Sequence, residues 1–254
     1  MIKEINAGNL KVKIFNTRAE MGRCAANEAA ACIRKLQEQK DEINMIFAAA
    51  PSQNETLAEL VSSEGIKWEK INAFHMDEYI GISADAPQAF GNFLKERIFD
   101  KLPFKSVNYI YADGESYEDT CKRYSDLIKS HPIDIVCLGI GENGHIAFND
   151  PWVADFNDSE IIKRVELDNV CRNQQVNDGC FKTLEDVPTH ALTLTVPTLF
   201  NADYLFCTVP AKTKAEAVYN TVNAEINEDV PAAIMRKHKN AVMYCDSDSA
   251  SKLL

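Results

Sequence analysis

Short apolar runs alternate along the chain with longer stretches in which apolar residues recur every three or four positions. The short runs predict strands at 10–15, 44–50, 71–76, 107–111, 133–140, 191–196, 204–209 and 241–245. The longer stretches predict helices that start after Thr17 and after Ser52, and helices over 90–99, 117–129 and 213–224. Because strands that alternate with helices form βαβ units, we predict an α/β fold with a Rossmann-like, mainly parallel sheet and helices on both faces.

Two of the helix starts carry the capping-box pattern, in which a hydroxyl side chain is followed three residues later by glutamate. The pairs are Thr17 with Glu20 and Ser52 with Glu55. A polar stretch over 155–187 breaks the alternation and is long for a simple connection. We interpret residues 1–254 as a single domain and 155–187 as a lid over a site.

The segment over 138–151 carries the clearest candidate chemistry. An apolar strand ends at Gly139, and the loop that follows holds His145 between Asn143 and Asp150. Open α/β sheets bind ligands outside the carboxyl ends of their strands. Since the unperturbed pKa of histidine is close to neutral, an oriented histidine at such a place suits proton transfer. A glycine-rich connection with a surface histidine is the alternative interpretation.

A second predicted strand, over 71–76, ends in two adjacent carboxylates, Asp77 and Glu78. The carboxyl ends of parallel strands meet at one edge of a sheet, so Asp77 and His145 are placed to face one ligand. A solvated turn, in which Asp77 bonds to a backbone amide, is the alternative.

These two segments resemble the signature segments of glucosamine-6-phosphate deaminases (isomerases). They read Phe-His-Met-Asp-Glu-Tyr over 74–79 and Leu-Gly-Ile-Gly-Glu-Asn-Gly-His-Ile-Ala-Phe-Asn-Asp-Pro over 138–151. Residues 212–218 resemble the lysine-bearing helix start of that family, and the likeness runs from about residue 10 to residue 246. The related 6-phosphogluconolactonases share the fold but have a Gly-His-Thr-Ala-Ser type run, and Asp-Glu-Arg in place of Asp-Glu-Tyr.

The resemblance implies an enzyme of amino-sugar metabolism that converts glucosamine 6-phosphate, or a close relative, and water to fructose 6-phosphate and ammonia. It implies that Asp77 moves a proton between C2 and C1 of the sugar and that His145 opens the sugar ring. Asn143 and Asp150 would orient the imidazole, and Lys214 would bind the phosphate. Acid–base help of this kind typically contributes roughly 10²–10⁴-fold. No cofactor is implied.

The chain departs from the commonest family pattern beside the histidine. Many members have aspartate at the position of Asn143, and asparagine can hold His145 without sharing its proton. Many have glutamate at the position of Asp150, whose shorter side chain would need a bridging water to reach His145. Neither change removes the chemistry.

A third departure concerns the phosphate loop, which normally reads Thr-Gly-Ser-Thr-Pro or similar and which has no glycine here, over 51–56. Ser52, Asn54 and Thr56 can still donate hydrogen bonds, and a helix N-terminus attracts anions. Glu55 adds a negative charge, and its capping-box role would occupy an amide. Either the phosphate is held differently, or the substrate is a different amino sugar or sugar phosphate.

Further residues complete the expected substrate contacts. Lys214 matches the phosphate lysine of the family, with a solvated first-turn lysine as the alternative. Arg172, inside the predicted lid, is a second candidate for the phosphate. Glu78 and Gly144 are also expected to contact the substrate.

A metal-binding alternative would use His75, Asp77, His145 and Asp150 as ligands. No local spacing such as His-Glu-x-x-His supports it, and the family chemistry needs no metal. We therefore predict no metal, and we expect His75 to pack or to hydrogen-bond beside the site.

Net charge and cysteine content limit the kinds of partner that the protein can bind and the cell compartment in which we expect it. The net charge of −11 disfavours nucleic acid, whose phosphates need clustered Lys and Arg. The eight cysteines form no Cys-x-x-Cys pair, and most lie in apolar runs, so we expect reduced core thiols. The positions of Cys121, Cys171 and Cys180 are less clear. No secretory leader and no run of membrane-spanning length is recognisable, so we expect a cytoplasmic protein, monomeric or homo-oligomeric, that does not bind membranes.

Two other functions stay open beside the deaminase. A 6-phosphogluconolactonase would use His145 as a base but would have no use for a group that abstracts a proton from C2. A non-catalytic sugar-phosphate sensor would use the same fold as an effector module, and the unusual loop at 52–56 keeps this alternative open.

Overall fold

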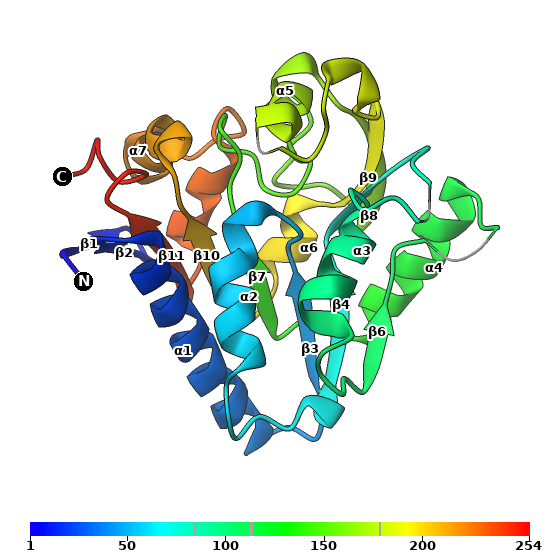
Figure 1. Cartoon of the computed structure of the whole chain (residues 1–254), viewed down its shortest axis with the longest axis horizontal. Coiled ribbons are helices and arrows are strands. Elements are labelled where there is room, and N and C mark those ends of the chain that lie inside the picture. Colours follow the sequence, from blue (N-terminus) through cyan, green and yellow to red (C-terminus); the bar gives the residue numbers. More distant parts are fainter. Residues whose placement is uncertain (84, 112–113, 178) are drawn as a thin grey trace.

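A computed structural model describes residues 1–83, 85–111, 114–177 and 179–254. A central sheet lies between layers of helices (Figure 1). Its strands are β1 (Lys3–Ala7), β2 (Leu10–Phe15), β3 (Ile43–Phe47), β4 (Ile71–His75), β6 (Ser106–Asn108), β7 (Ile135–Leu138), β10 (Tyr204–Val209) and β11 (Ala241–Asp246). They follow the order β1-β2-β11-β10-β7-β3-β4-β6, and every neighbouring pair except β1 with β2 is parallel. The predicted α/β fold with a mainly parallel sheet is confirmed.

Seven α-helices occur in the described residues. They are α1 (Arg18–Gln37), α2 (Asn54–Val61), α3 (Phe90–Leu94), α4 (Tyr117–Ser130), α5 (Asn169–Asn177), α6 (Val196–Phe200) and α7 (Ala215–Asn223). Shorter turns are η1 (Pro51–Gln53), η2 (Trp68–Lys70), η4 (Leu184–Asp186), η5 (Lys212–Lys214) and η6 (Pro231–Lys237), and α3 continues into a π-helical turn, η3 (Lys95–Phe99). No helix in this part of the chain combines the length and the apolar character needed to cross a bilayer.

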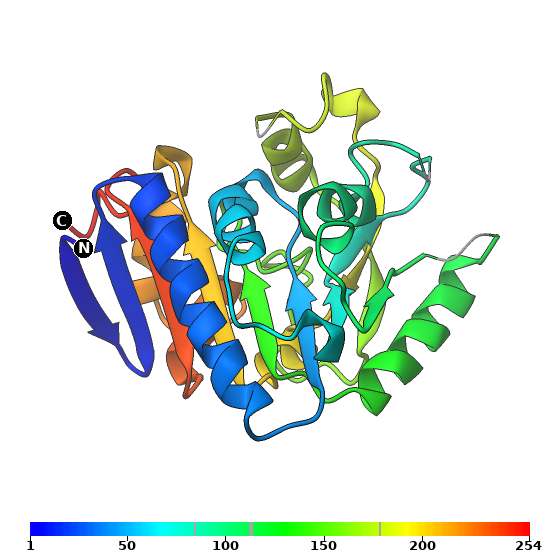
Figure 2. The same cartoon turned by 60° about the horizontal axis from the view of Figure 1, so that its bottom comes forward.

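Alternate residues of the sheet strands enter two separate cores. Met45 and Phe47 of β3 join the core that buries α1, α2 and α3, whereas Ile46 between them joins the core that buries α4, α6 and α7. Figure 2 shows α1, α2 and α3 together on one face of the sheet. Because successive side chains of a strand point to opposite faces, a parallel strand covered on both sides is apolar throughout. This explains the unbroken apolar runs of the sequence.

A second, antiparallel sheet is ordered β5 (Asp77–Tyr79), β9 (His190–Leu194) and β8 (Ile162–Glu166). The strand predicted at 191–196 therefore exists, but it does not belong to the main sheet. A short apolar run fits a buried strand in a parallel or an antiparallel sheet, so the periodicity of the sequence does not distinguish these two arrangements. The polar stretch at 155–187 contributes β8 and α5 and is not a simple connection.

The first predicted capping interaction is present at the start of α1. Thr17 Oγ1 accepts a hydrogen bond from the backbone N–H of Glu20 at 3.1 Å. The Glu20 carboxylate accepts from the N–H of Asn16, at 3.2 Å, and not from that of Thr17. The Thr17 side chain thus fixes the point where the chain leaves β2 and enters α1.

The second predicted capping box, Ser52 with Glu55, is wrong. The chain forms the turn η1, and α2 begins at Asn54 without a side-chain cap. Glu55 instead accepts a hydrogen bond from Arg18 Nε at 2.6 Å. The starts of α1 and α2 lie so close that a Cβ at Gly22 would be 2.4 Å from the Glu55 Cβ. This contact between helices, which the local sequence does not encode, places the Glu55 carboxylate on Arg18 although the residue stays in the first turn of α2.

Candidate active site

One cleft opens at the carboxyl ends of the central strands. After β3 the chain adds β4 and β6 on one side, and after β7 it adds β10 and β11 on the other, so the strand order reverses between β3 and β7. Such a switch point leaves a crevice for ligands in open α/β sheets. The polar and charged residues that line this cleft are Arg18, Ser52, Asp77, His145, Gln174, Gln175, Thr213 and Lys214.

The loop after β7 places the His145 imidazole on the cleft wall. Gly141 lies directly against this ring, because a Cβ at Gly141 would be 2.1–2.3 Å from three of its atoms. The backbone N–H of His145 donates to Asn143 Oδ1 at 3.1 Å. Gly144 turns the chain with φ +83°, a conformation that glycine adopts without strain. The glycines of this motif therefore make room for the imidazole and orient it.

Asn143 and Asp150 support the imidazole from behind. Asn143 Nδ2 donates to Asp150 Oδ1 at 2.8 Å, and His145 Nδ1 lies 3.0 Å from the same oxygen. Asp150 is fully buried. Burial alone would raise the pKa of Asp150, but its contacts with His145 and Asn143 outweigh this effect and hold the pKa below its usual value. With Nδ1 turned toward a carboxylate at direct contact distance, Nε2 is the nitrogen left for the cleft, and no bridging water is needed.

Asp77 reaches the cleft because the chain leaves the main sheet after β4. Met76 separates β4 from β5, and Asp77 pairs with Thr193 in the second sheet. The carboxyl is buried, and burial, together with the neighbouring Glu78, raises its pKa well above the usual value. A carboxyl with a raised pKa holds its proton to higher pH than an ordinary aspartate.

His75 fixes the backbone beside Asp77 from the opposite side. Its Nδ1 bonds to the carbonyl oxygen of Asp77 at 3.0 Å, and its Nε2 accepts from the N–H of Ile110 at 2.8 Å. Burial lowers the pKa of His75 to about 4. The expectation that His75 hydrogen-bonds beside the site is confirmed, and the residue is not available as the metal ligand of the alternative set.

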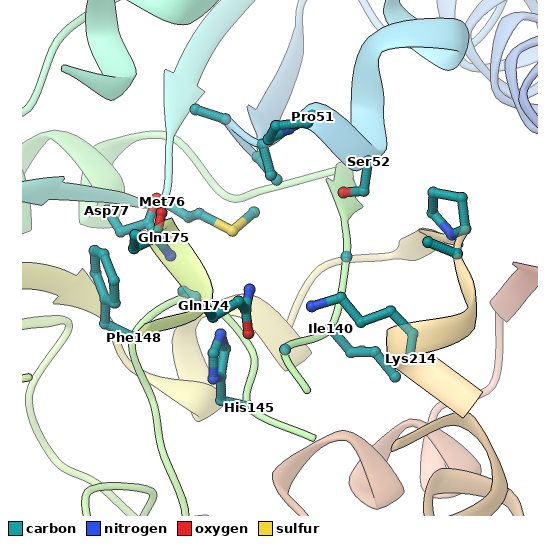
Figure 3. A pocket seen from close by; sticks show the side chains of 18 of the residues that line it. Pro51, Ser52, Met76, Asp77, Ile140, His145, Phe148, Gln174, Gln175 and Lys214 are labelled. Atoms are coloured by element: carbon teal, nitrogen blue, oxygen red, sulfur yellow. The ribbon is translucent and has the colours of Figure 1, made fainter. Parts of the chain in front are cut away.

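The structure brings two of the predicted substrate-binding residues, Ser52 and Lys214, into the same cleft as Asp77 and His145. Figure 3 shows these four side chains around one space, with Gln174 beside the histidine. Lys214 ends the turn η5 before α7 and is nearly buried. A carboxyl, an imidazole and an ammonium group therefore share one cavity.

The other predicted substrate contacts lie away from the cleft lining. Asn54 Oδ1 accepts from Arg97, and Thr56 is buried within α2. Glu78 turns to the backbone N–H groups of Tyr79, Phe90 and Gly91, beside a second cavity.

Two further predicted contacts are engaged elsewhere. Arg172 donates to the carbonyl oxygens of Leu184 and Val187. Gly144 packs against Val230, and its carbonyl accepts from the N–H of Ala232.

Sequence reasoning missed Arg18, Gln174 and Gln175, which also line the cleft. Arg18 follows the cap residue at the carboxyl end of β2, so the rule that singled out His145 could have found it. Gln174 Oε1 accepts from the N–H of Glu142, which joins α5 to the histidine loop. The two glutamines lie on α5, so the segment interpreted as a lid forms part of the cleft wall. Closure of that segment over a ligand stays a prediction.

One group of potential metal ligands occurs among the described residues. It consists of His145, Asp150 and Cys171, whose candidate ligand atoms lie within 4.8 Å of one another.

The fold and the cleft define a Rossmann-like α/β protein with carboxyl, imidazole and ammonium groups around one cavity. The family model of glucosamine-6-phosphate isomerases/6-phosphogluconolactonase matches residues 16–244. The chain therefore belongs to this family, which is a family of enzymes, and the resemblance seen in the sequence is confirmed.

Individual relatives agree with this assignment. The chain is 33% identical over 213 residues to a glucosamine-6-phosphate deaminase of Listeria monocytogenes serotype 4a (strain HCC23), covering 84% of this chain and 88% of that protein. It is 33% identical over 194 residues to a glucosamine-6-phosphate deaminase of Exiguobacterium sp. (strain ATCC BAA-1283 / AT1b), covering 76% of this chain and 74% of that protein.

Solved structures show the same fold. A monomeric glucosamine-6-phosphate deaminase superposes with a TM-score of 0.83 at 28% identity, covering 94% of this chain and 98% of that one. A 6-phosphogluconolactonase from Thermotoga maritima superposes with a TM-score of 0.75 at 19% identity, covering 92% and 99%. The second match shows a shared fold alone.

Proposed function

We propose that this enzyme converts glucosamine 6-phosphate, or a closely related amino-sugar phosphate, and water to fructose 6-phosphate and ammonia. The observation that carries the proposal is the presence of Asp77, His145 and Lys214 around a single cleft. The curated relatives at 33% identity, which are glucosamine-6-phosphate deaminases, support the same reaction.

Ring opening is assigned to His145. The reaction moves a proton from the C1 hydroxyl to the ring oxygen, and Nε2 of a neutral imidazole can accept the first proton and deliver it to the second atom. Asp150, 3.0 Å from Nδ1, stabilises the imidazolium that forms between the two transfers. Asn143 holds the backbone of His145 and the carboxylate of Asp150 in place.

Isomerisation is assigned to Asp77. Its carboxylate takes the proton from C2 of the open-chain sugar and returns it to C1, which turns the C2 amine into an imine. Water then adds to C2 and ammonia leaves, so the atoms balance as one sugar and one water consumed and one ketose and one ammonia formed. Burial, which raises the pKa of Asp77, makes this carboxylate a stronger base than an exposed aspartate.

The phosphate is assigned to the part of the cleft with Ser52, Lys214 and Arg18. The glycine-free loop seemed unsuited to an anion because of Glu55. The Nε of Arg18 pairs with Glu55 at 2.6 Å, which offsets that negative charge and fixes the guanidinium at the cleft. Lys214 then supplies the net positive charge, and Ser52 and Arg18 supply hydrogen-bond donors, in place of the usual glycine-containing loop. We favour a phosphate that is held differently over a substrate without phosphate.

Ammonia release from glucosamine 6-phosphate tests the assignment. We expect turnover by the wild type and a loss of roughly 10²–10⁴-fold in Asp77→Asn, which keeps the size of the side chain and removes the base. Glu78→Gln is the matched comparison, because this adjacent carboxylate faces away from the cleft. It should keep most of the activity, with losses only as far as the start of α3 loosens and as the pKa of Asp77 moves when the Glu78 charge is removed.

Two results of this assay would contradict the proposal. Equal rates in the wild type and Asp77→Asn would exclude Asp77 as the catalytic base. If neither protein releases ammonia, the proposed reaction is wrong. Hydrolysis of 6-phosphogluconolactone that survives Asp77→Asn would favour the lactonase. Saturable binding of sugar phosphates without turnover of either substrate would favour the sensor.

We further propose that the enzyme works in the cytoplasm. All eight cysteines are among the described residues, none of them forms a disulfide there, and four of them are buried. This supports folding in a reducing compartment. Cell fractionation followed by the ammonia assay tests the location, and activity confined to an extracellular or membrane fraction would contradict it.

A further inference from the structure

A buried thiol lies beside the proposed acid–base pair. Cys171, in the first turn of α5, has its backbone N–H bonded to Asp168 Oδ1 at 2.7 Å, and its side chain lies against the carboxylate of Asp150. His145, Asp150 and Cys171 are each more than nine-tenths buried. Their candidate ligand atoms, one nitrogen, one oxygen and one sulfur, all lie within 4.8 Å of one another.

Two polar atoms of this cluster make no well-aligned hydrogen bond, although the His145 ring and the Cys171 thiol lie close enough to the Asp150 carboxylate to help lower its pKa. His145 Nδ1 and Asp150 Oδ2 are buried and have no hydrogen-bond partner within the described ranges of the chain. Nδ1 is close to Asp150 Oδ1, at 3.0 Å, but is not aligned for a directed hydrogen bond. Buried polar atoms are normally paired, and an unpaired one costs free energy. Among the described residues, the ligand atoms of this cluster are therefore satisfied only in part, by one another.

We infer that His145, Asp150 and Cys171 form a binding site for a soft divalent cation of the Zn²⁺ type, and that occupation of this site switches off His145. Imidazole, carboxylate and thiolate are the ligands of Zn²⁺ in proteins, at about 2.0–2.3 Å from the ion. Ligand atoms around such a tetrahedral ion are about 3.3–3.8 Å apart, which fits within the observed separation. Three protein ligands leave a fourth position for a water molecule.

Metal binding would act on the tautomer of His145. In the metal-free protein the Nδ1 proton faces Asp150, and Nε2 keeps a lone pair for the sugar. A cation bound to Nδ1 leaves the remaining ring proton on Nε2, which then cannot accept a proton from the substrate. The thiol of Cys171 gives up its proton to solvent as the sulfur–metal bond forms. Loss of turnover follows from the proposed function, whereas binding of the cation does not depend on it.

Cobalt(II) provides a test that does not need turnover, because a thiolate ligand gives Co²⁺ an intense near-ultraviolet charge-transfer band. We expect the wild type to bind one Co²⁺ with this band and to lose it when Zn²⁺ is added. Cys171→Ser should lose the band. Cys121→Ser, which removes a half-buried thiol on α4, should keep it and controls for adventitious thiol binding.

Inhibition completes the test. Zn²⁺ should abolish ammonia release by the wild type and by Cys121→Ser with one ion per chain, and a chelator should restore it. Cys171→Ser should need at least ten-fold more Zn²⁺, and Cys171→Ala serves as a second variant if the serine variant folds poorly. A cobalt complex without the thiolate band, or a band kept in both Cys171 variants, would overturn the site. A thiolate band in a protein that never releases ammonia would support the site and contradict only the proposed function.

Discussion

The stability of the fold should depend on pH through His75. This side chain is buried, and each ring nitrogen has one partner: Nδ1 bonds to the carbonyl of Asp77, and Nε2 accepts from the N–H of Ile110. Protonation would put a proton on Nε2, where it would face the Ile110 N–H. Burial opposes the charge as well, and it lowers the pKa of His75 to about 4.

The sign and size of the effect follow from linkage. In the unfolded chain His75 has a pKa near 6.5, so on acidification the unfolded state binds the proton first and stability falls. The loss runs from about pH 6.5 down to the folded value of about 4. A difference of about 2.5 units corresponds to about 3 kcal/mol in the limit, of which about 2 kcal/mol is lost between pH 7 and pH 5.

Urea denaturation of the wild type and His75→Gln at pH 7 and pH 5 measures this loss of unfolding free energy on acidification. Glutamine can hydrogen-bond but does not titrate, so the variant is less stable at both values and should lose about 2 kcal/mol less than the wild type on acidification. The carboxyl groups that also titrate are common to both proteins and cancel in the comparison. The same two proteins at pH 7 and pH 8 should show no difference in pH dependence. Equal losses from pH 7 to pH 5 would refute the reasoning.

Three further predictions concern the cleft. Gly141→Ala places a Cβ about 2 Å from the His145 ring, so ammonia release should fall by at least about 10²-fold while circular dichroism shows a folded protein; undiminished turnover would contradict the contact. The pKa of Asp77 is raised, so kcat/KM should increase with pH through a value above the ordinary aspartate pKa of about 3.9; an acidic limb at that ordinary value would count against Asp77. Arg18→Ala should raise KM for glucosamine 6-phosphate roughly ten-fold or more with little change in kcat, as expected for one lost charge-assisted hydrogen bond, and should leave the weak binding of unphosphorylated glucosamine unaffected; an unchanged KM would remove Arg18 from the phosphate site.

The sequence is informative where local patterns and strand ends decide the structure. The strands before Asp77 and before Gly139 are buried throughout because both faces of the sheet are covered, and most of their residues are apolar. Their ends could be located, and the rule that parallel strands end at one edge predicted that Asp77 and His145 lie near each other. The cap at Thr17 was also readable, because it depends on residues three positions apart.

The rest depends on contacts between segments that are distant in the sequence. Glu55 leaves its predicted cap because Arg18, 37 residues earlier, reaches it. Cys171 and Gln174 are buried on a short helix of mostly polar residues, so no apolar periodicity marks the face that they turn to the site. Asp77 is displaced onto a second sheet by its pairing with Thr193, a non-local pairing that the apolar run around Thr193 did not reveal.

A structure of the Asp77→Asn variant with glucosamine 6-phosphate bound tests the central claim most directly. The account predicts that C2 of the sugar lies within about 3.5 Å of the side chain at position 77, and that the ring oxygen or the C1 hydroxyl lies within about 3.2 Å of His145 Nε2. The phosphate should contact Lys214, Ser52 and Arg18. A sugar bound elsewhere, or bound with its phosphate beside His145, would contradict it.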